Sequence, residues 1–356
     1  MVRGEQEENV MKILYISPSP PPPIPGTDGL FTEIGYLEKS FKGKNIALSP
    51  FRSIPPIFPV NLYGIQHLPF IGKLDREVDL HHVFFPHLVD FRILRSLSKP
   101  VIFSLTSGVI SETLPRSAVP FHIVVSSKQE ADILQTKGHE LVRIIRPGID
   151  YARIDSSPYT GPHDEFVLLF GSAPWVKSQF ASKGFDLVLE AMVHLPKIRL
   201  ICLWRGTLYH EWCEKVSSAG LSNRVEIIRE KGDISRILSR CHAAVVLASK
   251  ADLVKSYPNS LMEALVAGKP VLISRAIPMS YYVEKNGCGI VVESLATYGL
   301  ISAISELQNR YSIFKSAADL VGRCDFSCRR MVEEYRRTYE ELTEQEDKKS
   351  GNIKIG

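Results

Sequence analysis

The chain has 356 residues, of which 44% are hydrophobic and 23% are charged, and its formal net charge at pH 7 is +4. This composition is typical of an ordinary globular protein and excludes the disordered and fibrous classes. The small positive charge permits an anionic ligand or a peripheral contact with a membrane surface, but the basic residues lack the clustering of a nucleic-acid-binding protein. Because the chain is too long for one ordinary core, we expect two domains.

The first part of the chain alternates short apolar runs with amphipathic helical windows. The runs are nearly continuous in apolar residues, as the strands of a parallel sheet covered on both faces must be. They lie at 12–17, 45–49, 79–85, 100–105 and 122–127. This pattern predicts a Rossmann-like α/β domain over residues 1–150.

A segment rich in Pro, Gly, Ser and Asp follows at 146–165 and has no apolar periodicity. Such a segment is typical of a hinge, which we expect at 151–165. A second series of apolar runs predicts a second Rossmann-like domain over 166–310, with strands at 165–171, 198–204, 224–228, 243–248, 270–274 and 289–293. The last part, 311–356, is predicted to contain helices and a frayed tail, with Met331, Tyr335 and Tyr339 at helical spacing.

The fold class is therefore α/β, with two doubly wound domains in one chain. Open α/β sheets bind ligands at the carboxyl ends of their strands. We expect the two domains to face each other across an interdomain cleft that holds a ligand. The architecture alone does not name that ligand.

The cysteines and the apolar runs indicate the cellular compartment of the protein. The cysteine spacings fit neither a disulfide framework nor a zinc site. We therefore expect reduced thiols and a cytoplasmic protein. No run approaches eighteen apolar residues, and the acidic, polar start "MVRGEQEENV" has no signal-peptide core. The expectation is a chain that neither spans a membrane nor is exported.

The segment "PNSLMEA" at 258–264 combines the signals of a helix start with a carboxylate. Ser260 and Glu263 have the spacing of a capping box. The same geometry suits a ligand, since a helix N-terminus binds phosphate and a carboxylate accepts hydrogen bonds from a ribose diol. Glu263 is predicted to cap the helix, to bind a ligand, or to do both.

At this point the sequence resembles glycosyltransferase family 4, a family of retaining enzymes with the GT-B fold. The resemblance is carried by "YPNSLMEALVAGKPVLIS" at 257–274, between "AAVVLAS" and "YYVEKNGCGIVV". Earlier segments fall in the family's order, and they are "KILYIS", "VVSSKQEADILQTKG", "IIRPGID" and "SKGFDLVLEAM". The resemblance spans roughly residues 12 to 340. It implies transfer of a sugar from a nucleotide-sugar donor to a hydroxyl acceptor with retention of configuration.

The resemblance also implies a donor site in the C-terminal domain. Glu263 would bind the donor ribose. Lys183, with Lys177 as a second cation, would hold the diphosphate. The helix N-terminus would assist through Asn259, Ser260 and Leu261, and the base would lie near Arg229 and Lys231. These cations would stabilise the charge that develops on the leaving nucleoside diphosphate.

Three positions depart from the family pattern around the donor sugar. Lys255 stands where the first glutamate of a glutamate, seven residues, glutamate pattern is expected. Either Asp252 supplies that acid from a longer loop, or Lys255 occupies the position and changes the donor or the activity. Ser172 replaces an arginine that grips the diphosphate, and Ser107 replaces a histidine before Gly108.

These departures keep a second function open, a degenerate GT-B protein that binds a nucleotide sugar or glycan without transfer. The histidines at 81, 82 and 87 are predicted to be either core residues or groups that point into the cleft. Gly26 and Gly29 would border the acceptor and the diphosphate. No Asp-x-Asp motif occurs, so we expect no metal and no cofactor, with the nucleotide sugar acting as a substrate. The acceptor would be a glycan, a lipid or a small molecule.

Overall fold

The fold is described from a computed structural model. It describes residues 11–22, 28–49, 64–84, 96–106, 122–154, 159, 164–204, 207–230 and 232–353, with side chains as far as residue 345. Among these residues the chain forms two compact units. Unit 1 extends to Ile145 and resumes at Met331, and unit 2 extends from Arg146 to Arg330. Each unit is described by itself below.

Unit 1 is built on a six-stranded parallel sheet in the order β2-β1-β3-β4-β5-β6. The strands are β1 (Lys12–Ser17), β2 (Lys42–Ala47), β3 (Leu80–Phe84), β4 (Val101–Ser104), β5 (His122–Val125) and β6 (Val142–Ile144). The helical segments are α1 (Gly29–Ser40), η2 (Ile65–His67), α2 (Leu68–Glu77) and α4 (Lys128–Thr136). Along β1, Ile13 and Tyr15 join one apolar cluster and Leu14 and Ile16 join another, because side chains alternate between the faces of a sheet.

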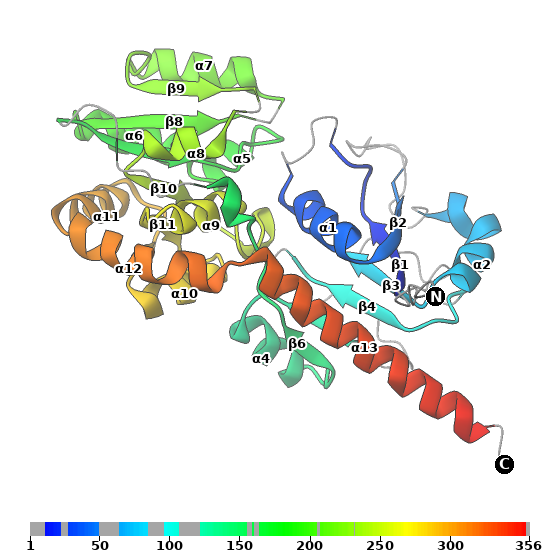
Figure 1. Cartoon of the computed structure of the whole chain (residues 1–356). Coiled ribbons are helices and arrows are strands. Elements are labelled where there is room, and N and C mark those ends of the chain that lie inside the picture. The colour runs from blue at the N-terminus through cyan, green and yellow to red at the C-terminus, as the bar shows by residue number, and fades with distance from the viewer. Residues whose placement is uncertain are drawn as a thin grey trace, which may run out of the picture. The chain divides into compact units, whose positions relative to one another are not determined.

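The long helix α13 (Cys328–Ile353) returns the chain to unit 1. Figure 1 shows it in red near the C-terminus. Its side chains Tyr335 and Tyr339 are buried in a polar network with β3 and β4. The ring nitrogens of His82 lie 2.7 Å from the hydroxyls of Tyr339 and Ser104, and the Ser104 hydroxyl lies 2.9 Å from that of Tyr335. Burial lowers the pKa of His82 to about 3, so the ring is neutral at pH 7 and one nitrogen donates while the other accepts.

Unit 2 is built on a second six-stranded parallel sheet in the order β12-β11-β10-β7-β8-β9. The strands are β7 (Phe166–Phe170), β8 (Ile198–Leu203), β9 (Val225–Ile228), β10 (Ala243–Val246), β11 (Val271–Ser274) and β12 (Gly289–Val292). The helical segments are η4 (Tyr151–Arg153), α5 (Gln179–Ser182), α6 (Phe185–His194), α7 (Tyr209–Ser218), α8 (Ile234–Ser239), η5 (Ala251–Leu253), α9 (Asn259–Val266), α10 (Met279–Asn286), α11 (Thr297–Asn309) and α12 (Tyr311–Asp325). Its strand order is that of the classic Rossmann sheet.

Helix α9 of unit 2 packs closely against α12. A Cβ placed on Gly322 of α12 would lie 1.9 Å from the carbonyl oxygen of Leu265 in α9. Only glycine therefore allows this approach of two helix backbones. Figure 1 shows α12 in orange beside α9, α10 and α11.

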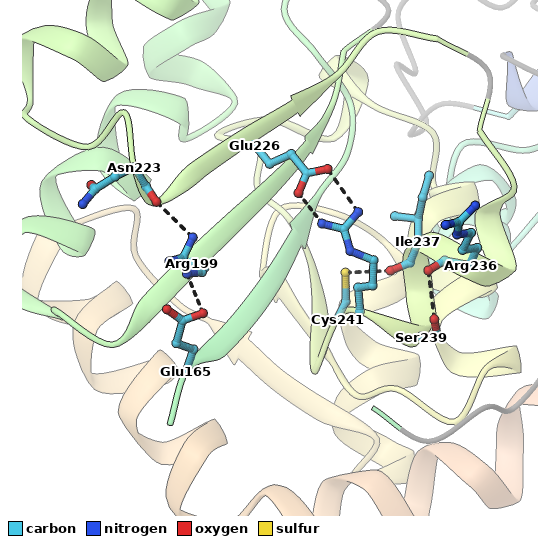
Figure 2. A network of polar contacts seen from close by, with 9 residues as sticks. Glu165, Arg199, Asn223, Glu226, Arg236, Ile237, Ser239 and Cys241 are labelled. Carbon is cyan, nitrogen blue, oxygen red and sulfur yellow. Dashed lines mark hydrogen bonds and ion pairs between the residues drawn. The ribbon is translucent and has the colours of Figure 1, made fainter. Parts of the chain in front are cut away.

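The amino ends of β7, β8 and β9 are joined by polar contacts (Figure 2). The Arg199 guanidinium bridges the Glu165 carboxylate and the carbonyl oxygen of Asn223, at 2.5 and 2.9 Å. Glu226 pairs with Arg240, whose Nη1 lies 3.1 Å from a carboxylate oxygen. This network lies at the amino ends of the strands. Open α/β sheets bind ligands at the opposite edge, at the carboxyl ends of their strands.

The predicted strands are confirmed in position, with two exceptions. The run predicted at 45–49 begins earlier, at Lys42, because an edge strand tolerates exposed lysines. The three-residue strand β6 was not predicted, and it contains the charged residue Arg143. The tail predicted to fray continues instead as helix α13 to Ile353, since Glu, Gln and Lys are good helix formers.

The division of the chain also differs from the prediction of domains at 1–150 and 166–310 with a hinge at 151–165. The compact units meet between Ile145 and Arg146, and the residues from Met331 onward pack with unit 1. The physical reason is the apolar stripe of α13, whose Met331, Tyr335 and Tyr339 complete the core of unit 1.

The six cysteines are free thiols, as predicted. They are Cys202, Cys213, Cys241, Cys288, Cys324 and Cys328. None of the helices in the described part of the chain combines the length and apolarity needed to cross a bilayer.

Candidate functional site

The strand order of unit 2 locates a ligand site. The chain leaves β7 toward β8 on one side and leaves the adjacent strand β10 toward β11 on the other. The carboxyl ends of β7 and β10 thus flank a topological switch point, where open α/β sheets bind their ligands. The segments that follow these two strands carry most of the predicted donor-site residues.

Gly171 and Ser260 bring the two sides of the switch point together. Gly171 follows β7, and Ser260 lies in the first turn of α9, which follows β10. A Cβ placed on Gly171 would lie 2.6 Å from the Ser260 hydroxyl oxygen. The glycine therefore allows the N-terminus of α9 to lie directly against the end of β7.

Lys183 lies beside this contact, in the connection between α5 and α6. Its side chain is almost wholly buried, with 4% of the residue exposed. Its Nζ lies 3.5 Å from the carbonyl oxygen and 3.4 Å from the hydroxyl oxygen of Ser172. Burial lowers the pKa of the Lys183 ammonium to about 8, so it is still mostly charged at pH 7. The structure thus places the Lys183 ammonium next to Ser172.

Two further contacts fix the backbone around Lys183. The amide of Ser249, which follows β10, donates to the carbonyl of Ser182 at 2.8 Å. Gly184 has a φ of +69°, and a Cβ there would lie 2.7 Å from the Leu247 side chain. These contacts tie the lysine segment to the end of β10.

The predicted capping box at the start of α9 is wrong. The residue before the helix is Pro258, which makes no side-chain capping hydrogen bond, and the helix begins at Asn259. Ser260 is therefore inside the helix, two positions after the N-cap residue Pro258. Asn259, Ser260 and Leu261 form the first turn, whose backbone N–H groups carry the positive end of the helix dipole.

Glu263 lies one turn into α9 and is largely enclosed by the protein. Burial raises the pKa of its carboxyl group to about 7, and the positive charge of Arg153 in η4 partly offsets this effect. At pH 7 the carboxyl group is therefore half ionised. A hydroxyl group that donates to this carboxylate would favour its charged form.

Asp252 and Lys255, the two residues considered at the position of the missing glutamate, lie in different surroundings. Asp252 lies in η5 with its side chain exposed. Lys255 is half-buried, and its Nζ lies 3.5 Å from the side-chain oxygen of Asn259 at the start of α9. Lys255 therefore lies next to the helix N-terminus, where the family pattern expects a glutamate.

Two of the remaining donor-side candidates, Lys177 and Arg229, lie on exposed loops. Lys177 is mostly exposed, and its Nζ lies 3.9 Å from the carboxylate of Glu211. Arg229 follows β9 and covers the ring of Tyr209, with its Cζ 4.3 Å from the ring centroid. Lys231 lies outside the described residues.

Few of the candidates from the first part of the chain can be placed. Gly29 is the first residue of α1, directly after Asp28, whose carboxylate accepts a hydrogen bond from the amide of Leu30 at 2.9 Å. Gly26, Ser107, Gly108 and His87 lie outside the described residues. His81 and His82 are core residues, and the His81 ring lies 2.7 Å from the carboxylate of Asp75.

Two features of the site were not singled out from the sequence. One is Arg153, whose positive charge acts on Glu263 and which follows the "RPGID" segment without a motif of its own. The other is the positive φ of Ser172, at +67°. A serine in place of the family's arginine was visible, but the backbone conformation was not. Among the described residues, no group of three or more His, Cys, Asp or Glu side chains is arranged to hold a metal ion.

Part of unit 2 matches a known protein family. Residues 173–318 match the family model for glycosyl transferases group 1, which covers less than half of the chain. The match includes Lys183, Glu263 and the whole of α9. A search of curated proteins finds no relative.

Solved structures resemble the whole chain. Sucrose-phosphate synthase from Thermosynechococcus elongatus matches with a TM-score of 0.74 at 15% identity, covering 93% of this chain and 99% of that one. The Anabaena protein HepE, in complex with UDP and glucose, matches with a TM-score of 0.69 at 17% identity, covering 93% and 100%. WaaG, a glycosyltransferase involved in lipopolysaccharide biosynthesis, matches with a TM-score of 0.62 at 14% identity, covering 94% and 98%. The chain therefore has the GT-B fold, and residues 173–318 of its unit 2 are similar to the glycosyl transferases group 1 family.

Proposed function

We propose that the protein is a glycosyltransferase that moves a sugar from a nucleotide-sugar donor to a hydroxyl acceptor with retention of configuration. The observation that carries this proposal is the buried cation Lys183 beside Ser172, which follows Gly171, the residue packed against Ser260 at the start of α9. Among the described residues no carboxylate is hydrogen-bonded to this ammonium, and a buried cation of this kind is suited to an anionic ligand. HepE, a protein of the same fold, was solved with UDP and glucose, which supports a nucleotide-sugar donor.

Different residues of the site would bind different groups of the donor. The diphosphate would lie between the Lys183 ammonium and the N-terminus of α9, at Asn259, Ser260 and Leu261. The ribose hydroxyls would donate to the Glu263 carboxylate. When the bond between the sugar and the diphosphate breaks, the leaving group gains negative charge, and the cation and the helix dipole stabilise it. The acceptor hydroxyl would then attack from the same face of the sugar.

The acceptor is proposed only by class, as a hydroxyl group of a glycan, a lipid or a small molecule. The pneumococcal O-GlcNAc transferase GtfA, also similar in structure, was solved with UDP and GlcNAc, which supports donors that carry a hexose. The net charge of +4 is compatible with a peripheral contact to an anionic membrane.

The experiment that tests the proposal begins with a thermal-shift panel of nucleotides and nucleotide sugars. A ligand that binds only the folded state raises the midpoint by an amount set by its concentration and affinity, so a positive result identifies the donor. The identified donor, labelled in its sugar, is then incubated with candidate acceptors and the products are separated. Lys183→Ala and Glu263→Ala should each abolish both donor binding and transfer.

A matched control is available at the opposite edge of the same sheet. Lys197 precedes β8 and is exposed, so Lys197→Ala removes a lysine of unit 2 without touching the site. This variant should bind and transfer like the wild type. The proposal fails if no nucleotide or nucleotide sugar in the panel stabilises the protein.

The position of Lys255 favours a second candidate function, binding of a nucleotide sugar without transfer. Its ammonium lies at the start of α9, where the family pattern expects a carboxylate, and the alternative acid Asp252 is exposed. This candidate predicts donor binding with neither transfer nor donor hydrolysis. Restoring the acid with Lys255→Glu would then be expected to create measurable hydrolysis of the donor.

A further inference from the structure

Ser172 has a backbone conformation that serine rarely adopts. Its φ is +67°, and among the described residues it is the one non-glycine residue with a positive φ. For an L-residue with a Cβ, this left-handed region costs free energy. Residues held in such conformations cluster at functional sites, where the surrounding structure enforces them.

The conformation directs two oxygens of one residue toward one ammonium. The Nζ of Lys183 lies 3.5 Å from the carbonyl oxygen of Ser172 and 3.4 Å from its hydroxyl oxygen. Both distances exceed the usual range for a hydrogen bond, so the contacts are weak and leave donor capacity on the ammonium.

The surroundings of Lys183 explain why a weak neutral partner is useful. The side chain is 4% exposed, and burial alone disfavours its charge. A carboxylate partner would keep the lysine protonated. Its negative charge would also cancel the positive charge of the ammonium and compete with an anionic ligand. A carbonyl and a hydroxyl favour the ammonium while they leave its net positive charge intact.

We propose that Ser172 is a positioning residue, whose left-handed backbone holds the Lys183 ammonium charged and oriented for the donor diphosphate. The inference rests on the proposed function, because it assumes that Lys183 meets the donor. It assigns to Ser172 a role different from that of the arginine it replaces. Ser172 acts through Lys183 and contributes no charge of its own.

Three substitutions separate the hydroxyl from the backbone strain. Ser172→Ala removes the hydroxyl and keeps the strained conformation. Ser172→Gly removes the hydroxyl and relieves the strain, because glycine enters the left-handed region readily. Ser172→Asn keeps an oxygen acceptor on a residue type that tolerates this region, and it should act as the rescue variant.

The first measurement follows the protonation of Lys183 without any donor. Competitive labelling with acetic anhydride over a range of pH, read by mass spectrometry, gives the midpoint at which this amine becomes reactive. In the wild type the midpoint should reflect a pKa of about 8. In Ser172→Ala and Ser172→Gly it should move lower by roughly half a pH unit, because an acceptor of the charged form is lost.

The second measurement is the binding of inorganic pyrophosphate and of UDP by titration calorimetry at a pH near 7.5. Both hydroxyl-free variants should bind these probes roughly threefold to tenfold more weakly than the wild type, the loss expected for one weak hydrogen bond. Ser172→Asn should recover most of the affinity. The melting temperature of Ser172→Gly should exceed that of Ser172→Ala by a few degrees, since only glycine relieves the strain.

The control is Ser182→Ala, which makes the same chemical change in the residue directly before Lys183. It should leave both the labelling midpoint and the pyrophosphate affinity at wild-type values. The proposal is overturned if Ser172→Ala also leaves both unchanged. If the wild type binds neither probe, the proposed function fails, and the labelling midpoints still decide whether Ser172 governs the Lys183 ammonium.

Discussion

The guanidinium of Arg146 and the carboxylate of Asp325 lie 3.8 Å apart at the point where the chain enters unit 2. The same carboxylate accepts a hydrogen bond from the Tyr282 hydroxyl at 2.7 Å and lies 3.8 Å from Arg330, the last residue of unit 2. Nearby, the amide of Ile149 donates to the carbonyl of Phe326 at 2.7 Å. The two segments through which the chain enters and leaves unit 2 are therefore fastened together.

Asp325 should accordingly matter for stability. Asp325→Ala is expected to lower the free energy of unfolding by about 1–3 kcal/mol, mainly because the buried Tyr282 hydroxyl loses its acceptor. Asp325→Asn keeps an acceptor and should cost less than the alanine variant. Urea denaturation measures both, and Asp132→Ala, which breaks an exposed pair with Lys128, should change little. Equal effects of the alanine and asparagine variants would contradict this account.

Donor binding should have a bell-shaped dependence on pH. The pKa of Glu263 is raised to about 7, so its carboxylate is present only above that pH. The pKa of Lys183 is lowered to about 8, so its ammonium is present only below that pH. The affinity for a nucleoside diphosphate should therefore be highest between these two values and fall on both sides.

Calorimetric titrations from about pH 5.5 to about pH 9.5 measure this profile. Glu263→Gln removes the titrating carboxyl group and should reduce the loss of affinity at acid pH. Any loss that remains in this variant comes from protonation of the ligand's phosphate groups. An affinity that stays constant across the whole range would argue against both assignments.

Lys183 should favour donor binding but lower the free energy of unfolding of the protein without ligand. Folding takes its ammonium out of water and lowers its pKa from 10.5 to about 8, so the charged form destabilises the folded state below pH 8. Lys183→Met should raise the free energy of unfolding at pH 7 by roughly 1–3 kcal/mol while it abolishes donor binding.

The pH dependence of this stability difference tests its sign. The wild-type lysine loses its proton in the folded state above about pH 8 and in the unfolded state above about 10.5, so the advantage of Lys183→Met should shrink between these values. Thermal denaturation at several pH values measures the difference. A variant less stable than the wild type at pH 7 would show that the lysine is held by contacts stronger than those with Ser172.

The network around His82 predicts how firmly α13 is attached within unit 1. Tyr339→Phe removes the hydroxyl 2.7 Å from the His82 ring and leaves a buried ring nitrogen without that partner. We expect a loss of about 1–3 kcal/mol in the free energy of unfolding, measured by urea denaturation. Thr343→Ala serves as the control, because the Thr343 hydroxyl bonds only to nearby carbonyls of its own helix, at 3.2 and 2.9 Å. A wild-type stability for Tyr339→Phe would contradict the role assigned to the network.

The sequence predicted the fold well where burial leaves a strong pattern. Most strands of the two sheets, such as β1, β7 and β10, are nearly continuous apolar runs, as buried parallel strands are. Strand β6 escaped this reasoning because it is short, lies at an edge and includes Arg143. The amphipathic stripe of α13 was visible, but a stripe does not say which core it completes.

The candidate site was predicted in its residue types more than in its geometry. The order of the motifs pointed to Lys183 and Glu263, but the burial that shifts the pKa of each depends on residues distant in the chain. The spacing of Ser260 and Glu263 fitted a capping box, yet the N-cap is Pro258, two residues too early for it. The left-handed backbone of Ser172 leaves no trace in a sequence, since serine is not a residue that such a conformation selects.

The contact of Gly322 with the backbone of α9 has a consequence for genetics. Any side chain at this position would push against Leu265 and displace the helix that carries Ser260 and Glu263. A random-mutagenesis screen for loss of sugar transfer should therefore recover substitutions at Gly322 together with those at Lys183. Gly322 would behave in such a screen as an active-site residue, although it lies on α12 and has no side chain with which to touch a ligand.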